Sequence, residues 1–339
     1  MQFSLVSVLV ASISLASLPM RAASQTQAAA TRHRRPSAVQ TSARSSALPE
    51  GVTAKDIHFY SEGIQCYGRI FMPKGLSSEG RLPAVVLAPG WGETAGSIEQ
   101  FASRFALRGL VAMTIDYRGW GRSGGFLQTL DPVKTDDRLR FSQMTARVRV
   151  LRKRLLPQQQ ILDIRNALYY LQGEPGVDRA RIGVWGAGMA GGHVIVIAAT
   201  DSRIKAAVAH APVIEGKNTP MQASAPTGEL LKAEQLRARN GQPPLSSAGA
   251  LADLETRLAL GDYHPFWYVE QLPQTSAVLF VITDKESTVS NESNATTASK
   301  LVKGPTAVVS IPATRNGGAA FEQAANAAAD WFLKHLGST

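Results

Sequence analysis

The chain has 339 residues, of which 44% are hydrophobic and 18% charged, so it can bury a full core, and α/β domains of this size are common. The single cysteine, Cys66, excludes an internal disulfide, and no cysteine–histidine spacing typical of a metal site occurs. Half of the net charge of +10 comes from arginines in the first 49 residues, which argues against nucleic-acid binding because basic tails are commonly solvated or processed segments.

Residues 1–24 are predicted to be a secretory signal peptide. Residues 5–18 form an apolar stretch of the length typical of a signal h-region, too short to span a bilayer comfortably. Small residues follow at Ala22, Ala23 and Ser24, so we expect cleavage there and a secreted or periplasmic protein. An organelle transit peptide is the alternative, because the leader is rich in arginine and serine and lacks acids. Residues 25–52 are expected to form a disordered basic linker before a domain at 53–339.

The folded part is predicted to begin with a hairpin of strands at 56–61 and 66–72. Residues 84–88 form a continuous apolar run, typical of a parallel strand covered on both faces. A helix at 98–108 and a second buried strand at 111–115 follow. Strands that alternate with helices in this way predict a parallel sheet with right-handed crossovers.

Residues 134–154 are strongly basic, with eight basic and two acidic side chains. Such a segment could bind an anionic surface or ligand. The alternative, which we prefer at this stage, is the solvated face of a helix.

Residues 181–194 contain an apolar strand, a glycine-dense turn and the start of a helix. Such a turn presents the nucleophile of α/β-hydrolases in the pattern G-x-S-x-G. Here the pattern runs from Gly186 to Ala190, and Gly188 stands at the nucleophile position. The nucleophile position normally has a strained positive φ, which glycine adopts without steric cost. The scaffold of the turn is therefore present without its hydroxyl group.

The pattern after this turn predicts further strands at 204–209, 277–282 and 307–311, and a terminal helix at 321–336. Residues 213–265 show no parallel-strand signal and are expected to form a cap over the site. His193 and His210 are interpreted as packing or rim residues rather than as a catalytic base.

Three segments carry a resemblance to a known group of enzymes: residues 116–125, 173–199 and 283–289. They resemble α/β-hydrolases grouped with dienelactone hydrolases and with X-Pro dipeptidyl-peptidase-like or cocaine-esterase-like acyl hydrolases. The resemblance covers about residues 52–337 and implies an α/β-hydrolase fold, with a mostly parallel, doubly wound sheet and a cap insertion.

The resemblance also implies the positions of a catalytic site. Gly188 would stand at the nucleophile position, Glu286 at the acid position and Arg315 where a histidine is expected. The backbone N–H groups of Trp91 and Met189 would be the oxyanion donors.

Without the serine and the histidine, no acyl-enzyme forms by the usual route. We therefore expect a catalytically impaired protein that binds a small acyl or ester-like ligand, or a partner. The alternative is an active ester or acyl hydrolase with a non-standard nucleophile or with water activated by Glu286. Ser97 and Ser123 lie in loops that face the site, but neither is expected to replace the nucleophile. We expect no cofactor, no metal, no nucleic acid and no stable membrane span, and the sequence does not define an oligomeric state.

Overall fold

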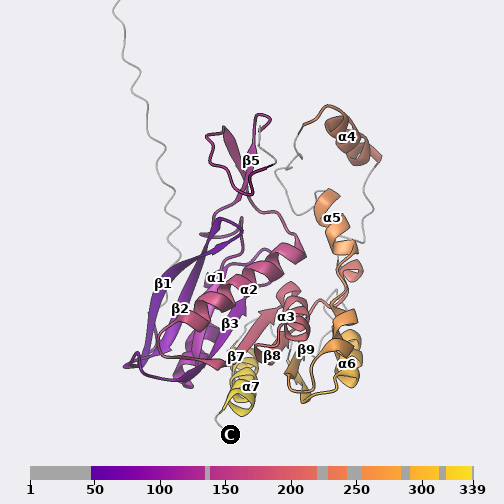
Figure 1. The fold of residues 1–339 in the computed structure, drawn as a ribbon. Coiled ribbons are helices and arrows are strands. Elements are labelled where there is room, and N and C mark those ends of the chain that lie inside the picture. The colour runs from indigo at the N-terminus through magenta and orange to yellow at the C-terminus, as the bar shows by residue number, and fades with distance from the viewer. Residues whose placement is uncertain are drawn as a thin grey trace, which may run out of the picture. The chain divides into compact units, whose positions relative to one another are not determined.

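An eight-stranded sheet is the centre of the fold in the computed structural model (Figure 1), with strand order β1-β2-β4-β3-β7-β8-β9-β10. The structure describes residues 47–133, 138–219, 228–242, 254–283, 291–312 and 318–337. Residues 45–339 form one compact unit, and residues 1–44 lie outside the described part. The bounds of the strands are β1 Val52–Ser61, β2 Ile64–Pro73, β3 Leu82–Ala88, β4 Val111–Ile115, β7 Val177–Ala187, β8 Ile204–His210, β9 Ala277–Thr283 and β10 Thr306–Ile311.

The sheet is antiparallel at one edge and parallel elsewhere. β1 pairs with β2 and β2 with β4 in antiparallel register, whereas β4, β3, β7, β8, β9 and β10 run parallel. The predicted opening hairpin is therefore confirmed, and so is the mostly parallel, doubly wound sheet. The central strands are buried on both faces, which explains their continuous apolar runs.

Helices cover both faces of the sheet. The helices are α1 Ala95–Leu107, α2 Pro157–Gly173, α3 Met189–Thr200, α4 Gly228–Arg239, α5 Leu254–Gly261, α6 Asn291–Leu301 and α7 Gly318–Leu336. The side chains of α2, α3 and α6 pack into one core, and those of α1 and α7 pack into a second core on the opposite face. Successive side chains of β7 point to opposite faces of the sheet, so Val184 packs into the first core and Trp185 into the second.

The segment predicted as a cap begins after β8 and ends before β9. It contains the short 3-10 helix η1 Gly216–Asn218 and the helices α4 and α5, and it runs into η3 Pro265–Gln271. Its role as a cover of the site stays a prediction. None of the described helices combines the length and apolar character needed to cross a bilayer.

The basic segment at 134–154 is not a helix, so our preferred interpretation of it was wrong. Residues 134–137 lie outside the described residues, and β6 Val148–Leu151 pairs antiparallel with β5 Phe126–Thr129 in a separate two-stranded sheet. The reason is a period of two: arginines at 147 and 149 alternate with the β-branched residues Val148 and Val150, a pattern that favours a strand.

Candidate active site

Gly188 occupies the turn between β7 and α3 with the backbone of a nucleophile elbow. Its φ is 55° and its ψ is −116°, and it is the N-cap of α3. Its amide donates a hydrogen bond to the carbonyl oxygen of His210 at 2.9 Å. Its carbonyl oxygen accepts hydrogen bonds from the amides of Gly191 at 3.0 Å and Val213 at 2.8 Å. These contacts hold the turn at a positive φ, which costs a residue with a Cβ about 1 to 3 kcal/mol.

Glycine occupies the positions around the elbow for different physical reasons. A Cβ at Gly186 would lie 2.3 Å from the carbonyl oxygen of Ala190, and one at Gly192 would lie 2.2 Å from that of Val213. Close packing of α3 therefore requires glycine at both positions. A Cβ at Gly188, in contrast, would meet nothing within 4 Å among the described residues. Open space remains where a nucleophilic side chain would stand, so the strain of the turn alone favours glycine there.

The two predicted oxyanion donors lie at this end of the sheet, Met189 at the start of α3 and Trp91 in the loop after β3. Met189 is the first residue of α3, where an amide N–H has no partner within the helix. Trp91 follows Gly90 in the loop after β3, and a Cβ at Gly90 would lie 3.3 Å from the carbonyl oxygen of Ala187. The loop that carries Trp91 therefore rests against the residue before the elbow, as an oxyanion hole built from both amides requires.

Glu93 is a site residue that the sequence analysis missed. Its Oε2 atom accepts a hydrogen bond from the Gly90 amide at 3.0 Å, so a carboxylate lies in the same turn as the Trp91 amide. The signal was an acid two residues after Trp91, in a loop already assigned to the site. A carboxylate at this place disfavours a second negative charge nearby, because like charges repel.

The predicted acid and base positions follow β9 and β10 in the chain. Glu286 and Arg315 both lie outside the described residues. The strands that lead into them, β9 and β10, are parallel neighbours, and β8 pairs with β9. The carboxyl ends of these strands therefore share one edge of the sheet with the elbow.

His193 is a packing residue on α3, as predicted. Its Nε2–H donates to Gln160 Oε1 at 2.9 Å, and its Nδ1 lies 2.8 Å from the hydroxyl oxygen of Tyr263. Because the neutral ring carries its proton on Nε2, the Tyr263 hydroxyl donates to Nδ1, and its oxygen also lies 3.2 Å from the carbonyl oxygen of Met189. Complete burial lowers the pKa of His193 to about 3, so the ring is neutral and ties α3 to α2 and to the segment before η3.

His210 lies at the end of β8 and packs on the opposite face of the sheet. Its ring meets those of Phe101 and Trp185 edge to face, each at 5.7 Å between centroids. Burial lowers its pKa to about 4. Neither His193 nor His210 is placed to take a proton from a group at Gly188, since His193 is held by two partners and His210 packs edge to face on Phe101 and Trp185.

The described serine and cysteine candidates have structural roles. Ser123 is buried, donates to the carbonyl oxygen of Asp116 at 2.6 Å and accepts from the Tyr67 amide at 2.8 Å. Ser97 lies in the first turn of α1 rather than in a loop as predicted, and it donates to the carbonyl oxygen of Thr94 at 2.7 Å. Cys66 is buried in β2, and burial raises the pKa of its thiol to about 12. Within the described ranges, no three His, Cys, Asp or Glu side chains cluster as a metal site would.

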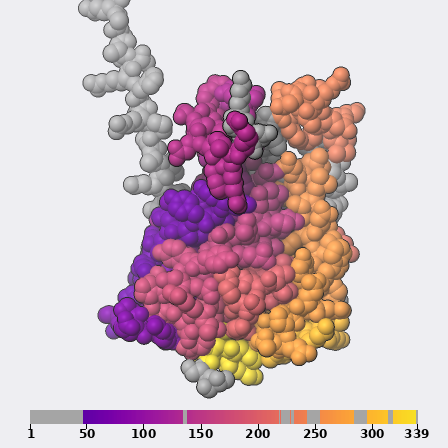
Figure 2. Space-filling view, in the orientation of Figure 1, coloured from indigo at the N-terminus to yellow at the C-terminus, as the bar shows by residue number. Residues whose placement is uncertain are grey.

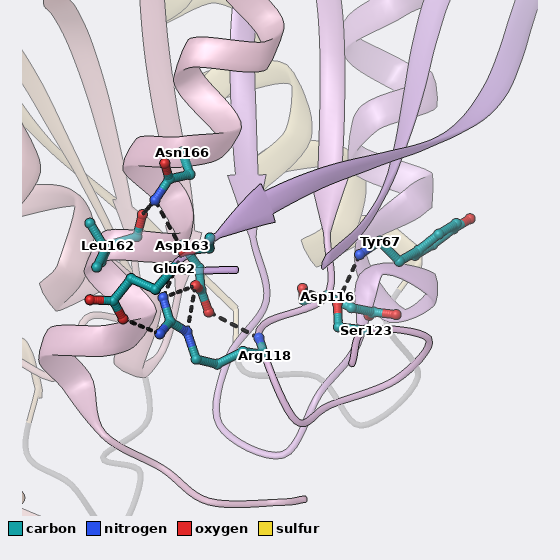
Figure 3. Close-up of polar contacts among 9 residues, drawn as sticks. Glu62, Tyr67, Asp116, Arg118, Ser123, Leu162, Asp163 and Asn166 are labelled. Carbon is teal, nitrogen blue, oxygen red and sulfur yellow. Dashed lines mark hydrogen bonds and ion pairs between the residues drawn. The ribbon is translucent and has the colours of Figure 1, made fainter. Parts of the chain in front are cut away.

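The loop after β4 is held by a buried ionic network (Figure 3). The Arg118 side chain donates to Asp163 at 2.8 Å, and the backbone amide of Arg118 donates to the same carboxylate at 2.9 Å. The guanidinium group also pairs with Glu62 and donates to Ser61 at 2.6 Å. The carboxylate of Asp116 accepts from the first amide of α1, that of Ala95, at 2.7 Å. The motif of residues 116–123 is therefore a scaffold beside the site.

Comparisons with known proteins agree with this geometry. The sequence model of the family described as acetyl xylan esterase (AXE1) matches residues 42–217. The quorum-quenching protein AidA of Acinetobacter baumannii is 27% identical over 167 residues, which are 49% of this chain and 46% of AidA. The chain thus matches about half the length of this relative.

Solved structures show the same fold. The α/β-hydrolase GrgF from Penicillium sp. is 18% identical, with a TM-score of 0.64 over 84% of this chain and 100% of GrgF. DcsB, solved in complex with its substrate analogue, is 18% identical, with a TM-score of 0.65 over 84% of this chain and 100% of DcsB. The predicted α/β-hydrolase fold is confirmed, and so is the α/β-hydrolase part of the resemblance.

Proposed function

The chain belongs to the acetyl xylan esterase (AXE1) family, and from that premise we propose that it binds a small acyl or ester-like ligand without forming an acyl-enzyme. The observation that carries the proposal is Gly188, which holds the conformation of the nucleophile elbow but has no side chain. We also propose a closer relationship to dienelactone hydrolases and X-Pro dipeptidyl-peptidase-like enzymes, with a degenerate catalytic triad.

Acyl transfer by this fold needs a hydroxyl group, a base and oxyanion donors. The serine attacks the carbonyl carbon, histidine takes its proton, and two amides stabilise the oxyanion. Loss of the triad costs a factor of about 10⁶ in rate, and binding with an oxyanion hole retains roughly 10³ to 10⁴ over water. With glycine at 188 and arginine at 315, a binding protein is the better description.

The site favours a neutral carbonyl compound over a free acid. The amides of Met189 and Trp91 would donate to a carbonyl oxygen above Gly188, where space is open. The Glu93 carboxylate, bound to the adjacent Gly90 amide, would repel a carboxylate ligand. Esters, thioesters and lactones are therefore the expected ligands.

An active hydrolase with a non-standard nucleophile is the second candidate. The positive φ at the elbow and the helix N-terminus that follows it favour it, because both serve acyl transfer. One relative, matched over 44% of its length, bears the name thiohydrolase AneE (Aspergillus aculeatus). In this case water activated by Glu286, or an unrecognised side chain, would replace the serine.

Turnover of an activated ester distinguishes the two candidates. We expect no burst phase with p-nitrophenyl acetate and no labelling by a serine-directed phosphonate, judged against the same preparation from a deletion strain. Stoichiometric phosphonylation of any serine, or a burst equal to the protein concentration, would favour the hydrolase and reject the binding protein.

Ligand binding is tested by removing one donor. Proline is tolerated at the first position of a helix and lacks the N–H, so Met189→Pro deletes the proposed donor while α3 can persist. We expect calorimetric binding of a short-chain ester to weaken by about tenfold, as for one lost hydrogen bond. Met189→Leu is the matched control and should bind as the wild type does. Equal affinity of both variants for the ester would show that the Met189 amide does not bind the ligand.

A further inference from the structure

The hairpin of β5 and β6 presents an apolar face to solvent. We call the described residues 126–133 and 138–154 the arm; in Figure 2 it stands out from the body of the molecule. Leu127 pairs with Val150, and Thr129 pairs with Val148, so these four side chains share one face of the ribbon. Leu127 is 66% exposed and Val150 is 56% exposed. A strand face of this kind is normally packed against another element.

The segment of the chain that connects the two strands of the arm carries further large apolar side chains. Phe141 is 84% exposed, and Leu130, Leu139 and Met144 are exposed as well. Single exposed apolar residues are ordinary, but a group of them on one projecting element marks an interaction site.

The arm is also strongly basic. The sequence from 126 to 154 contains eight basic and three acidic side chains. Arg147 pairs with Asp131, and Arg149 donates to Gln128 on the face opposite Leu127 and Val150. Arg140 lies over the ring of Phe141, with its guanidinium carbon 5.6 Å from the ring centre. Apolar side chains on one face and arginines on the opposite face are the composition of a segment that binds at a lipid interface.

The base of the arm is rigidly attached to the loop after β4. Arg152 donates to the carbonyl oxygens of Ser123 at 2.6 Å and Gly121 at 2.7 Å. The indole of Trp120 donates to the carbonyl oxygen of Arg154 at 3.1 Å. This loop leaves the carboxyl end of β4, at the edge of the sheet that carries the elbow, so a surface bound by the arm would lie on that side of the domain.

We propose that the arm docks the protein on an anionic lipid surface. The face of Leu127 and Val150, together with Phe141, enters the boundary between headgroups and acyl chains, and the arginines bind lipid phosphates. Charge favours this occupant over a second copy of the chain, because two arms face to face would bring two basic clusters together.

Sedimentation of the full chain with vesicles tests the proposal. We expect binding to phosphatidylcholine vesicles that contain phosphatidylglycerol, weaker binding to phosphatidylcholine alone, and release at high salt. Leu127→Ser with Val150→Ser should weaken binding by at least about tenfold, from lost apolar burial. Arg140→Gln should weaken it by about fivefold. The leader is common to all variants, so its own lipid affinity cancels in these comparisons.

Two controls keep the test decisive. Tyr60→Ser changes a side chain that is 64% exposed on β1 and should bind as the wild type does. Phe141→Ala changes an arm residue outside any strand, so it reports on binding even where the double variant loses the hairpin. Wild-type affinity in Phe141→Ala and the double variant would overturn the proposal. So would a wild-type dimer that the double variant converts to a monomer without any vesicle binding, since a second copy would then be the occupant.

Discussion

The amide of Gly188 donates a hydrogen bond to the carbonyl oxygen of His210, which joins the ends of β7 and β8 at 2.9 Å. This bond holds the elbow at a φ of 55° although no nucleophile is present to need that conformation. The turn is thus maintained by the sheet and by the following helix rather than by its own side chain. Substitutions at Gly188 therefore measure how much stability a side chain removes and how much esterase activity it restores.

Gly188→Ser is expected to lower the free energy of unfolding by about 1 to 3 kcal/mol, because a Cβ enters a positive-φ turn. It should remain nearly inert toward esters, since triad members act as a unit. Urea unfolding and ester turnover measure the two effects. Gly188→Ala is the matched control and should lose similar stability. A serine variant more stable than the wild type would show that the turn is not an elbow.

The double variant Gly188→Ser with Arg315→His is expected to gain weak esterase activity above both single variants. The gain should be small, because an error near 1 Å in the position of the base costs about a hundredfold. Lengthening the loop after Pro312 should raise it further. Steady-state turnover of p-nitrophenyl acetate by the wild type, both single variants, the double variant and the double variant with the longer loop is the measurement. Activity no higher than in the single variants, even with the longer loop, would contradict the assignment of Arg315 to the base position.

Glu93→Gln is expected to raise the affinity for short carboxylates by about tenfold while ester affinity changes little. The reason is the loss of a negative charge beside the proposed carbonyl donors. Calorimetric titration with butyrate and with a butyrate ester gives both values. Glu79→Gln, at an exposed position, is the control. An unchanged ratio between the affinities for the acid and for the ester would show that Glu93 does not select the ligand.

Acid is expected to destabilise the protein through two histidines whose pKa values are lowered, His193 and His210. Burial lowers the pKa of His193 to about 3 and that of His210 to about 4, from an ordinary value of 6.5. Below pH 6.5 the unfolded chain binds more protons than the folded one, so the free energy of unfolding falls as pH decreases from 6.5 toward 4. Each histidine should cost about 2 kcal/mol at pH 5.

Urea unfolding between pH 7 and about pH 4 measures this slope. His193→Gln should flatten it between about pH 6.5 and pH 5, whatever its effect on stability at pH 7. Gln65→Ala, at an exposed position of β2 without an ionisable group, is the control and should keep the slope. An identical slope in His193→Gln would mean that this ring is protonated in the folded state.

Cleavage of the leader stays a prediction. Small residues after the apolar stretch at 5–18 place the expected start of the mature protein between residues 22 and 27. N-terminal sequencing of protein from the native host measures it. An intact Met1 would reject a cleaved signal peptide and with it the proposal of an exported protein.

Local pattern alone was enough for the sheet and for the elbow. The apolar runs at 84–88 and 111–115 correspond to β3 and β4, because strands buried on both faces are apolar at every position. The elbow was visible because a strand, a glycine turn and a helix follow one another within fourteen residues. The missing serine is equally a property of the sequence.

What only the tertiary structure decided involves residues that meet across the chain or across a turn. Leu127 and Val150 form one apolar face through pairing over a long connection, whereas the charges around them suggested a helix. Glu93 joins the site through a hydrogen bond to Gly90, which the spacing of residues does not reveal. Gly186 and Gly188 look alike in sequence, but α3 packs against the first and leaves open space at the second. Periodicity reports the burial of a segment, and only the fold decides which segments meet.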